Sequence, residues 1–300
     1  MKISDSIYQI DIRPLGYERQ VAVYLVVGEK YSMLVDTGPR CSVRVLYDEL
    51  TRLIDRKTLR YIALTHIHLD HGGGASTLLK MMGHSARILV HPRGVKHVVD
   101  PSKLWQASIN VLGREVAELQ GKPEPVDGEH VMGLMDGETI DLGGVYVKAI
   151  HTPGHAPHHI VYIVYPDKIA LTGDAVAIYY DGRIHPVSPP PFKAELALES
   201  IDKIKAESPL KITVSHFGVA SEPGIHVLDR AKNKIIQWMH IVREHIGKGV
   251  KDPLKIYEKL LELDEETAYI VRIRENNPLF KGSAYKSLLG IYYYLLEMKQ

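Results

Sequence analysis

Four side chains that can bind a metal ion occur within six residues of this sequence. The segment beginning at residue 65 reads THIHLDHGGG, and its donors are His66, His68, Asp70 and His71. Neutral imidazole and carboxylate are donors that zinc accepts where cysteine is absent, and the chain has one cysteine. His66 and His68 are two residues apart, so an extended backbone turns both toward the same side. This spacing predicts a metal site rather than a polar loop with chance histidines.

Three further donors stand where predicted strands end. His155 closes the motif HTPGH, Asp174 closes LTGD, and His216 lies within VSHFG. An isolated Asp or His in such a place is usually a turn or surface residue. Strand ends can meet at one edge of a sheet, however, and these three donors together with the first four would complete two metal shells.

The elements that must position these donors alternate between strands and helices. Apolar, β-branched segments predict strands at 6–12, 21–27, 31–35, 61–65, 87–91, 139–142, 145–150, 160–164, 169–172 and 210–214. Apolar residues three and four apart predict helices at 43–53, 75–82 and 194–206. Residues 92–135 are expected to form an irregular insertion with helices near 103–120. Some of its apolar residues could line a cavity above the metals, namely Leu104, Trp105, Ile109, Val111 and Leu112.

The apolar pattern changes after Pro223, where it repeats only at helical spacing. We therefore expect an α/β catalytic domain at 1–222 and a helical domain at 223–300. The last helix has an apolar, tyrosine-rich face formed by Tyr285, Leu288, Leu289, Tyr292, Leu295 and Leu296. We expect the helical part to pack near the mouth of the metal site and to contribute to a homodimer.

The composition narrows the class of partner. The chain is 45% hydrophobic, and its 37 Lys and Arg against 36 Asp and Glu give a formal net charge of +1. This balance argues against nucleic acid or a membrane surface and favours a small-molecule substrate. No apolar run reaches the ~18 residues of a membrane span, and the first residues lack an apolar signal core, so a cytoplasmic location is expected.

The order of the motifs HxHxDH, HTPGH, TGD and SH resembles the metallo-β-lactamase superfamily. The segment LVDTG at 34–38 and the turns at 136–137 and 143–144 resemble the same family. The likeness spans roughly residues 6–220. It implies an αββα sandwich with a metal site along one edge of the two sheets, followed here by a C-terminal helical appendage.

The resemblance also assigns roles by position. It implies that His66, His68 and His155 bind one metal, that Asp70, His71 and His216 bind a second, and that Asp174 bridges them. Zinc is the metal expected, with iron or manganese as alternatives. Asp36 would orient the ligand loop, His151 would not be a ligand, and His158 and His159 are expected at the surface or behind the ligands.

The implied activity is hydrolysis of a small ester, thioester or lactone by a hydroxide held between two metals. Asp70 could also take part in proton transfer, and Tyr179 or Tyr180 could stabilise the oxyanion. The C-terminal helices resemble those of glyoxalase II-type thioester hydrolases, although the sequence offers no convincing set of basic residues for glutathione. The alternatives are an iron persulfide dioxygenase using His66, His155 and Asp174, a nuclease, or a non-catalytic scaffold.

Overall fold

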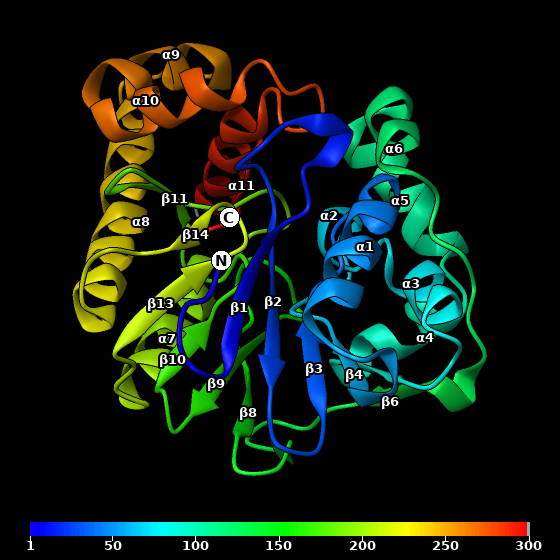
Figure 1. Ribbon diagram of the computed structural model, residues 1–300. Coiled ribbons are helices and arrows are strands. Elements are labelled where there is room, and N and C mark those ends of the chain that lie inside the picture. Colours follow the sequence, from blue (N-terminus) through cyan, green and yellow to red (C-terminus); the bar gives the residue numbers. More distant parts are fainter. Residues whose placement is uncertain (299–300) are drawn as a thin grey trace.

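Two six-stranded sheets face one another in the computed structural model, which describes residues 1–298 (Figure 1). The first sheet has the order β1-β2-β3-β4-β5-β6. Its first three strands are antiparallel, and β3 to β6 run parallel to one another. Its strands are β1 (Ile7–Asp11), β2 (Ala22–Val27), β3 (Ser32–Val35), β4 (Leu59–Ala63), β5 (Arg87–Val90) and β6 (Val131–Gly133).

The second sheet is built from the later part of the chain, in the order β14-β13-β10-β9-β8-β7. Neighbouring strands are antiparallel except β10 and β13, which are parallel. The strands are β7 (Thr139–Asp141), β8 (Tyr146–His151), β9 (Ile160–Tyr165), β10 (Ile169–Leu171), β13 (Lys211–Val214) and β14 (Gly218–Val219). A separate hairpin pairs β11 (Ile178–Tyr180) with β12 (Arg183–His185).

Side chains alternate between two apolar layers because both faces of each sheet are covered. In β2, Tyr24 points into the core between the sheets, whereas Val23 and Leu25 point to the outer helices. The inner core also ties the sheets by two reciprocal hydrogen bonds. Tyr24 donates its hydroxyl to the Val214 carbonyl at 2.6 Å, and Tyr162 donates to the Leu64 carbonyl at 2.9 Å.

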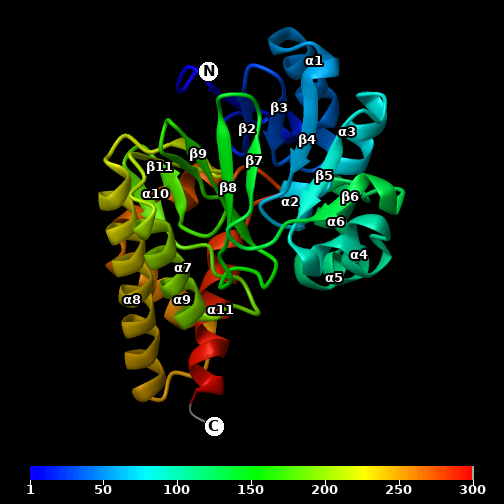
Figure 2. The same ribbon diagram turned by 90° about the horizontal axis from the view of Figure 1, so that it is seen from below.

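Helices cover the outer face of each sheet, which gives the expected αββα sandwich (Figures 1 and 2). On the first sheet lie α1 (Val43–Leu53) and α3 (Ala75–Met81). On the second lie α7 (Ala194–Ala206) and α8 (Gly224–Gly247), with α11 (Ser283–Glu297) packed against α8. The remaining helices are α2 (Leu69–Gly72), α4 (Val95–Val99), α5 (Ser102–Leu112), α6 (Arg114–Gln120), α9 (Pro253–Leu263) and α10 (Glu265–Arg274).

The C-terminal part is helical, and its core is continuous with that of the sandwich. Leu228 and Trp238 of α8 are fully buried in the same apolar cluster as Ile201 of α7 and Val161 of β9. The division into two domains near residue 222 stays a prediction, and the last two residues assigned to the second lie outside the described part of the chain. The homodimer also stays a prediction. Among residues 1–298, no helix combines the length and hydrophobicity of a membrane span.

Some elements differ from the sequence prediction. The insertion 92–135 is more regular than expected, since it contains α4, α5, α6 and the strand β6. β6 has only three residues and is partly exposed, so its pattern carries little signal, and it forms by extending the parallel pairing of β5. The short strands β11, β12 and β14 were likewise absent from the prediction.

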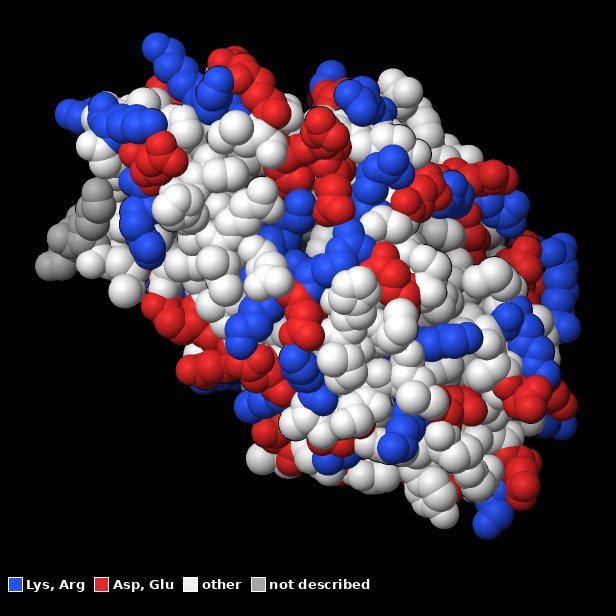
Figure 3. All heavy atoms as spheres, turned by 90° about the vertical axis from the view of Figure 1, so that its left-hand side faces the viewer, with Lys and Arg blue, Asp and Glu red and all other residues white. Residues whose placement is uncertain are grey.

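Charges of both signs are interleaved on the face that Figure 3 shows. Ion pairs join the neighbouring helices α7 and α8, including Lys232 with Asp202 and Lys205 with Asp229. Exposed pairs of this kind contribute little to stability. Their mixing agrees with the near-zero net charge.

Candidate metal centre

Seven donors gather where strands of both sheets end. His66 and His68 follow β4, and Asp70 and His71 lie on α2, the single turn of helix that continues this loop. The second sheet supplies the other three residues from the loops after β8, β10 and β13. These are His155, Asp174 and His216. The structure therefore brings all seven predicted donors to one edge of the sandwich.

Three of these histidines form one group of nitrogen donors. His66 Nε2 lies 2.9 Å from His68 Nδ1 and 3.2 Å from His155 Nε2, and the last two atoms are 3.1 Å apart. A tetrahedral zinc ion with nitrogens at 2.0–2.1 Å sets such separations at about 3.3 Å. The three atoms thus have nearly the spacing that one ion requires.

A second group contains Asp70, His71 and His216. His216 Nε2 lies 3.5 Å from Asp70 Oδ2, and His71 Nε2 lies 4.0 Å from the same oxygen. Asp174 stands between the groups. Its Oδ2 is 3.3 Å from His71 Nε2 and 3.6 Å from His155 Nε2, and its Oδ1 is 3.7 Å from His216 Nε2.

In His155 and His216, the hydrogen bond made by Nδ1 determines which ring nitrogen faces the cluster. Nδ1 of His155 bonds the Val187 carbonyl at 3.0 Å, and Nδ1 of His216 bonds the Gln20 carbonyl at 2.8 Å. A carbonyl only accepts, so both nitrogens carry the proton and leave Nε2 with its lone pair directed inward. Hydrogen bonds of this type orient the ligands in metal sites and raise their basicity.

Asp36 organises the loop from behind. It is buried at the end of β3, and its carboxylate accepts hydrogen bonds from the Thr65 amide at 2.8 Å and from His71 Nδ1 at 2.9 Å. Ser215 Oγ donates to it at 3.3 Å. Asp36 therefore connects the loops that carry His66, His71 and His216.

His159 and Gly173 hold Asp174. The Asp174 amide donates to His159 Nε2 at 3.2 Å, and Nδ1 of this fully buried histidine meets Thr152 Oγ1 at 2.8 Å. Gly173 has φ +51°, and a Cβ there would come within 2.8 Å of Thr65. Only glycine meets both conditions easily. His159 thus lies behind the donors, whereas His158 lines the cavity and His151 bonds the Leu134 carbonyl instead of the cluster.

Burial and mutual proximity shift the pKa values of the donors. Burial lowers the pKa of His66, His68 and His155, so these rings are neutral at pH 7. Burial alone would raise the pKa of Asp70 and Asp174, but the histidines around them outweigh it and hold both pKa values well below the usual range. Neutral His66, His68 and His155 and the ionised carboxylates are in protonation states that bind metals. For His71, burial lowers the pKa, but Asp174, Asp70 and Asp36 outweigh it and raise the pKa well above its usual value, so this ring must release a proton when it binds a metal.

The donor set fits divalent cations. His71 Nε2 and Asp174 Oδ1 are buried and have no hydrogen-bond partner within the described residues. Buried polar atoms without a hydrogen bond are costly, and both of these atoms face other donors of the cluster, where a cation would satisfy them. Histidine and carboxylate donors suit zinc, iron or manganese, so the composition allows a metal without selecting one.

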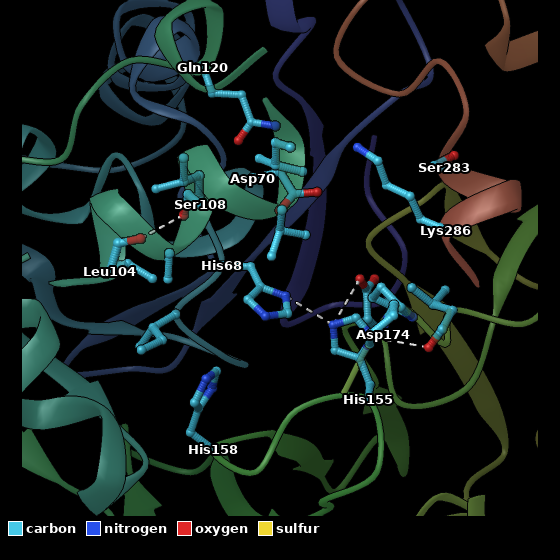
Figure 4. A pocket seen from close by; sticks show the side chains of 18 of the residues that line it. His68, Asp70, Leu104, Ser108, Gln120, His155, His158, Asp174, Ser283 and Lys286 are labelled. Carbon is cyan, nitrogen blue, oxygen red and sulfur yellow. Dashed lines mark hydrogen bonds and ion pairs between the residues drawn. The ribbon is translucent and has the colours of Figure 1, made fainter. Parts of the chain in front are cut away.

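A cavity of about 950 Å³ opens above this cluster. One wall is the stripe of α5 formed by Leu104, Ala107, Ser108, Val111 and Leu112. The C-terminal part supplies the opposite wall. In Figure 4, Leu104 and Ser108 lie on one side of the cavity and Ser283 and Lys286 on the other, with His68, His155 and Asp174 between them.

The tyrosines expected to help an oxyanion do not reach this cavity. Tyr179 bonds Ser221 Oγ at 2.7 Å, and the Tyr180 hydroxyl bonds the Arg19 carbonyl. Both are buried, and neither lines the cavity. The alternation of the β11 hairpin turns their hydroxyls into other contacts, so the geometry does not support the expected role.

Of the five insertion residues named from the sequence, three line the cavity. They are Leu104, Val111 and Leu112. Trp105 and Ile109 do not, because they fall off the helical stripe that faces the metals. Arg274, Phe280 and Lys286 of the C-terminal part also line the cavity, which the sequence did not predict. No helical or strand periodicity marks them, since tertiary packing alone places them there.

Comparison with known proteins agrees with this geometry. The sequence profile of the Metallo-beta-lactamase superfamily matches residues 16–216. The Metallo-beta-lactamase fold-containing protein ST1585 of Sulfurisphaera tokodaii is 29% identical over 218 residues, which cover 72% of this chain and 79% of that one. The crystal structure of ST1585 has a TM-score of 0.68 with 24% sequence identity, covering 91% of this chain and 100% of that chain.

Two similar proteins carry the names of thioester hydrolases. Hydroxyacylglutathione hydrolase of Aeromonas hydrophila is 26% identical over 213 residues, or 69% of this chain and 68% of that one. Human Acyl-coenzyme A thioesterase MBLAC2 is 26% identical over 192 residues, or 61% of this chain and 66% of that one.

Proposed function

Because this chain belongs to the metallo-beta-lactamase superfamily, we propose that it is a two-metal hydrolase of carboxylic esters and thioesters. The observation that carries the proposal is the pairing of two three-donor groups across a shared carboxylate, Asp174. A single-metal enzyme would need only one such group. Zinc is the metal we propose, in view of the histidine-rich donor set.

We assign the seven donors to two positions. His66, His68 and His155 would hold one cation, Asp70, His71 and His216 the other, and Asp174 would contact both. Two divalent cations supply Lewis acidity and lower the pKa of water, which is the chemistry that attack on an ester carbonyl requires near pH 7.

The chain's own residues would orient the donors and handle protons. Asp36 and His159 fix the rings and the bridging carboxylate, as their hydrogen bonds indicate. The Asp70 side chain is 22% exposed against 5% for Asp174, so Asp70 is the carboxylate that a substrate meets. Its position between the metals and the cavity would let Asp70 carry a proton from the attacking water toward the leaving group.

The thioester class is supported by the cavity as well as by the named relatives. The α5 stripe offers an apolar wall for an acyl chain, and the volume of about 950 Å³ admits more than a short acyl group. Lactones remain within the proposal because they are cyclic esters.

A substrate panel with metal analysis tests the proposal. The purified protein should contain about two equivalents of metal and should hydrolyse members of a set of esters, thioesters and lactones. Asp174→Ala should lower kcat by more than about 100-fold, since even groups behind metal ligands contribute 10–100-fold. Asp48→Ala is the matched control, because Asp48 is a partly exposed carboxylate of α1 outside the donor cluster and the cavity lining.

Other outcomes point elsewhere. One equivalent of iron with oxygen uptake on a persulfide would replace the proposal with the dioxygenase. Cleavage confined to phosphodiesters would replace it with the nuclease. Full turnover by Asp174→Ala at complete metal loading would refute the shared-carboxylate mechanism.

A further inference from the structure

Arg274 is buried in the wall of the cavity without a counter-charge. It is the last residue of α10 and is 3% exposed. Its Nε and Nη1 atoms are buried and have no hydrogen-bond acceptor among residues 1–298, and no ion pair within that range includes it. Its guanidinium lies 4.3 Å from the centre of the Phe280 ring. Burial lowers its pKa, as expected for a cation removed from water.

A second cation from the same part of the chain enters the cavity. Lys286 of α11 is partly buried and extends toward Asp70 (Figure 4). Within the described residues it forms neither an ion pair nor a side-chain hydrogen bond of its own. Burial lowers the pKa of its ammonium group, and Asp70 acts in the opposite direction.

The first turn of α11 adds a third positive feature. Ser283 is its first residue and lines the cavity, and Gly282 provides no side chain to cap the turn. The amides at the start of a helix carry partial positive charge and bind anions. We call Arg274, Lys286 and this turn the cationic end of the cavity.

Acidic groups do not balance this charge. The lining residues include six Lys and Arg, but the only acids among them are Asp70 and Asp174. Both acids belong to the donor cluster, so they are committed to the metals under the proposed function. A buried cation without a partner is unfavourable in the free protein and indicates that a ligand supplies the missing charge.

We infer that the cationic end binds an anionic group of the substrate, a carboxylate or a phosphate, while the scissile carbonyl sits at the metal cluster. The placement of the scissile carbonyl at the metal cluster rests on the proposed function. A guanidinium matches the paired oxygens of either anion. The substrates are accordingly esters or thioesters that carry a separate acidic group, and neutral analogues bind more weakly.

Equilibrium binding tests the inference without turnover. Dicarboxylates from glutarate to pimelate and the phosphonate 4-phosphonobutyrate are titrated into the metal-loaded protein by calorimetry, with butyrate and hexanoate as ligands that lack the second anion. At least one dianion should bind about tenfold or more tighter than the monocarboxylates. Tighter binding of a dicarboxylate would indicate a carboxylate site, and tighter binding of 4-phosphonobutyrate would indicate a phosphate site.

Variants locate the effect. Arg274→Met should remove the preference for the dianion, and Lys286→Gln should reduce it. Arg272→Met is the matched control, because Arg272 lies on the same helix but is exposed. Arg274→Met should also raise the melting temperature, since it removes a buried unpaired charge, whereas an arginine with a purely structural role would lower it when replaced.

The outcomes separate this inference from the proposed function. A wild-type protein with no preference for any dianion, or an Arg274→Met variant that keeps the full preference, would overturn the cationic end as a binding site. A protein that hydrolyses no ester or thioester would overturn the proposed function. The calorimetry would still show, independently of turnover, whether the cationic end binds a second anionic group.

Discussion

The ring of Phe280 stands edge-on against the ring of His216, with centroids 5.2 Å apart and an angle of 68° between the planes. Phe280 belongs to the loop between α10 and α11, whereas His216 is one of the seven donors in the sandwich. The helical part of the chain thus contacts the donor cluster directly. It is a wall of the site and not only an appendage.

Phe280→Ala should therefore weaken both the fold and the retention of metal. Removing a buried phenyl ring costs about 3–5 kcal/mol of unfolding free energy, and Phe280 is 5% exposed. Loss of the phenyl ring would also expose the His216 ring, which should speed the release of metal to a chelator. Urea unfolding and the rate of chelator-driven release measure the two effects. Phe280→Leu should recover most of both, and a release rate unchanged in the Ala variant would contradict the contact's role.

Asp36→Asn tests the support behind the donors. The amide keeps the shape of the side chain but cannot accept hydrogen bonds at both oxygens from Thr65 and His71. Metal affinity should fall about 10–100-fold, as it does for comparable groups elsewhere. Competition with a chromophoric chelator measures this affinity. Equal affinity in the variant and the wild type would show that Thr65 and Ser215 suffice to hold the loop.

His185 should make stability depend on pH. It is fully buried near Trp238, with a ring separation of 5.2 Å, and neither ring nitrogen has a hydrogen-bond partner in the described residues. Burial lowers the pKa of His185 to about 3 from 6.5. The folded state therefore holds the ring neutral while the unfolded state takes up a proton below pH 6.5.

Because the pKa of His185 is lower in the folded state than in the unfolded state, acid destabilises the fold. Stability is complete above pH 6.5 and is lost as the pH falls toward 3, at about 1.4 kcal/mol per pH unit from this residue. Between pH 6.5 and 5 the loss should be about 2 kcal/mol. His185→Phe should flatten this part of the profile in urea unfolding. Parallel profiles for the variant and the wild type would show that the ring is protonated in the fold.

Gly290 permits the close packing of α11 on the loop that borders the cavity. A Cβ at this position would lie 1.8 Å from the Ser188 carbonyl oxygen. Gly290→Ala should therefore lower the unfolding free energy by about 1–3 kcal/mol. Gly247→Ala is the control, because that helical glycine has no atom within 4 Å of the added carbon. It should raise stability by up to about 1 kcal/mol, and equal effects of the two changes would contradict the packing argument.

The sequence predicted those parts of the fold that local patterns specify. Strands such as β2 and helices such as α1 have strong periodicity and appear at the expected residues. β6 could not be predicted because three half-exposed residues acquire a strand only by pairing with β5. The same distinction holds in the site. His66 to His71 are a local motif, whereas Arg274 and Phe280 reach the cavity only through the packing of α10 and α11.

Tyr179 and Tyr180 were expected near the metals, and their oxyanion role has no support from the geometry. Tyr179 and Tyr180 are close to Asp174 in the sequence, which suggested a shared site. Both tyrosines belong to the first strand of a short hairpin, and their hydroxyls bond Ser221 and the Arg19 carbonyl, outside the cavity. Proximity along the chain is a weak guide to proximity in space where a turn of unknown geometry lies between.

The two tyrosine hydroxyls that cross the inner core bear on the order of assembly. Tyr24 bonds Val214, two residues before His216, and Tyr162 bonds Leu64, two residues before His66. Each half of the chain therefore anchors a donor loop of the other, and the seven donors can meet only after the halves have docked. Such long-range closure is slow. A cation would therefore bind only after this slow step, and its binding would stabilise the docked arrangement of the two halves.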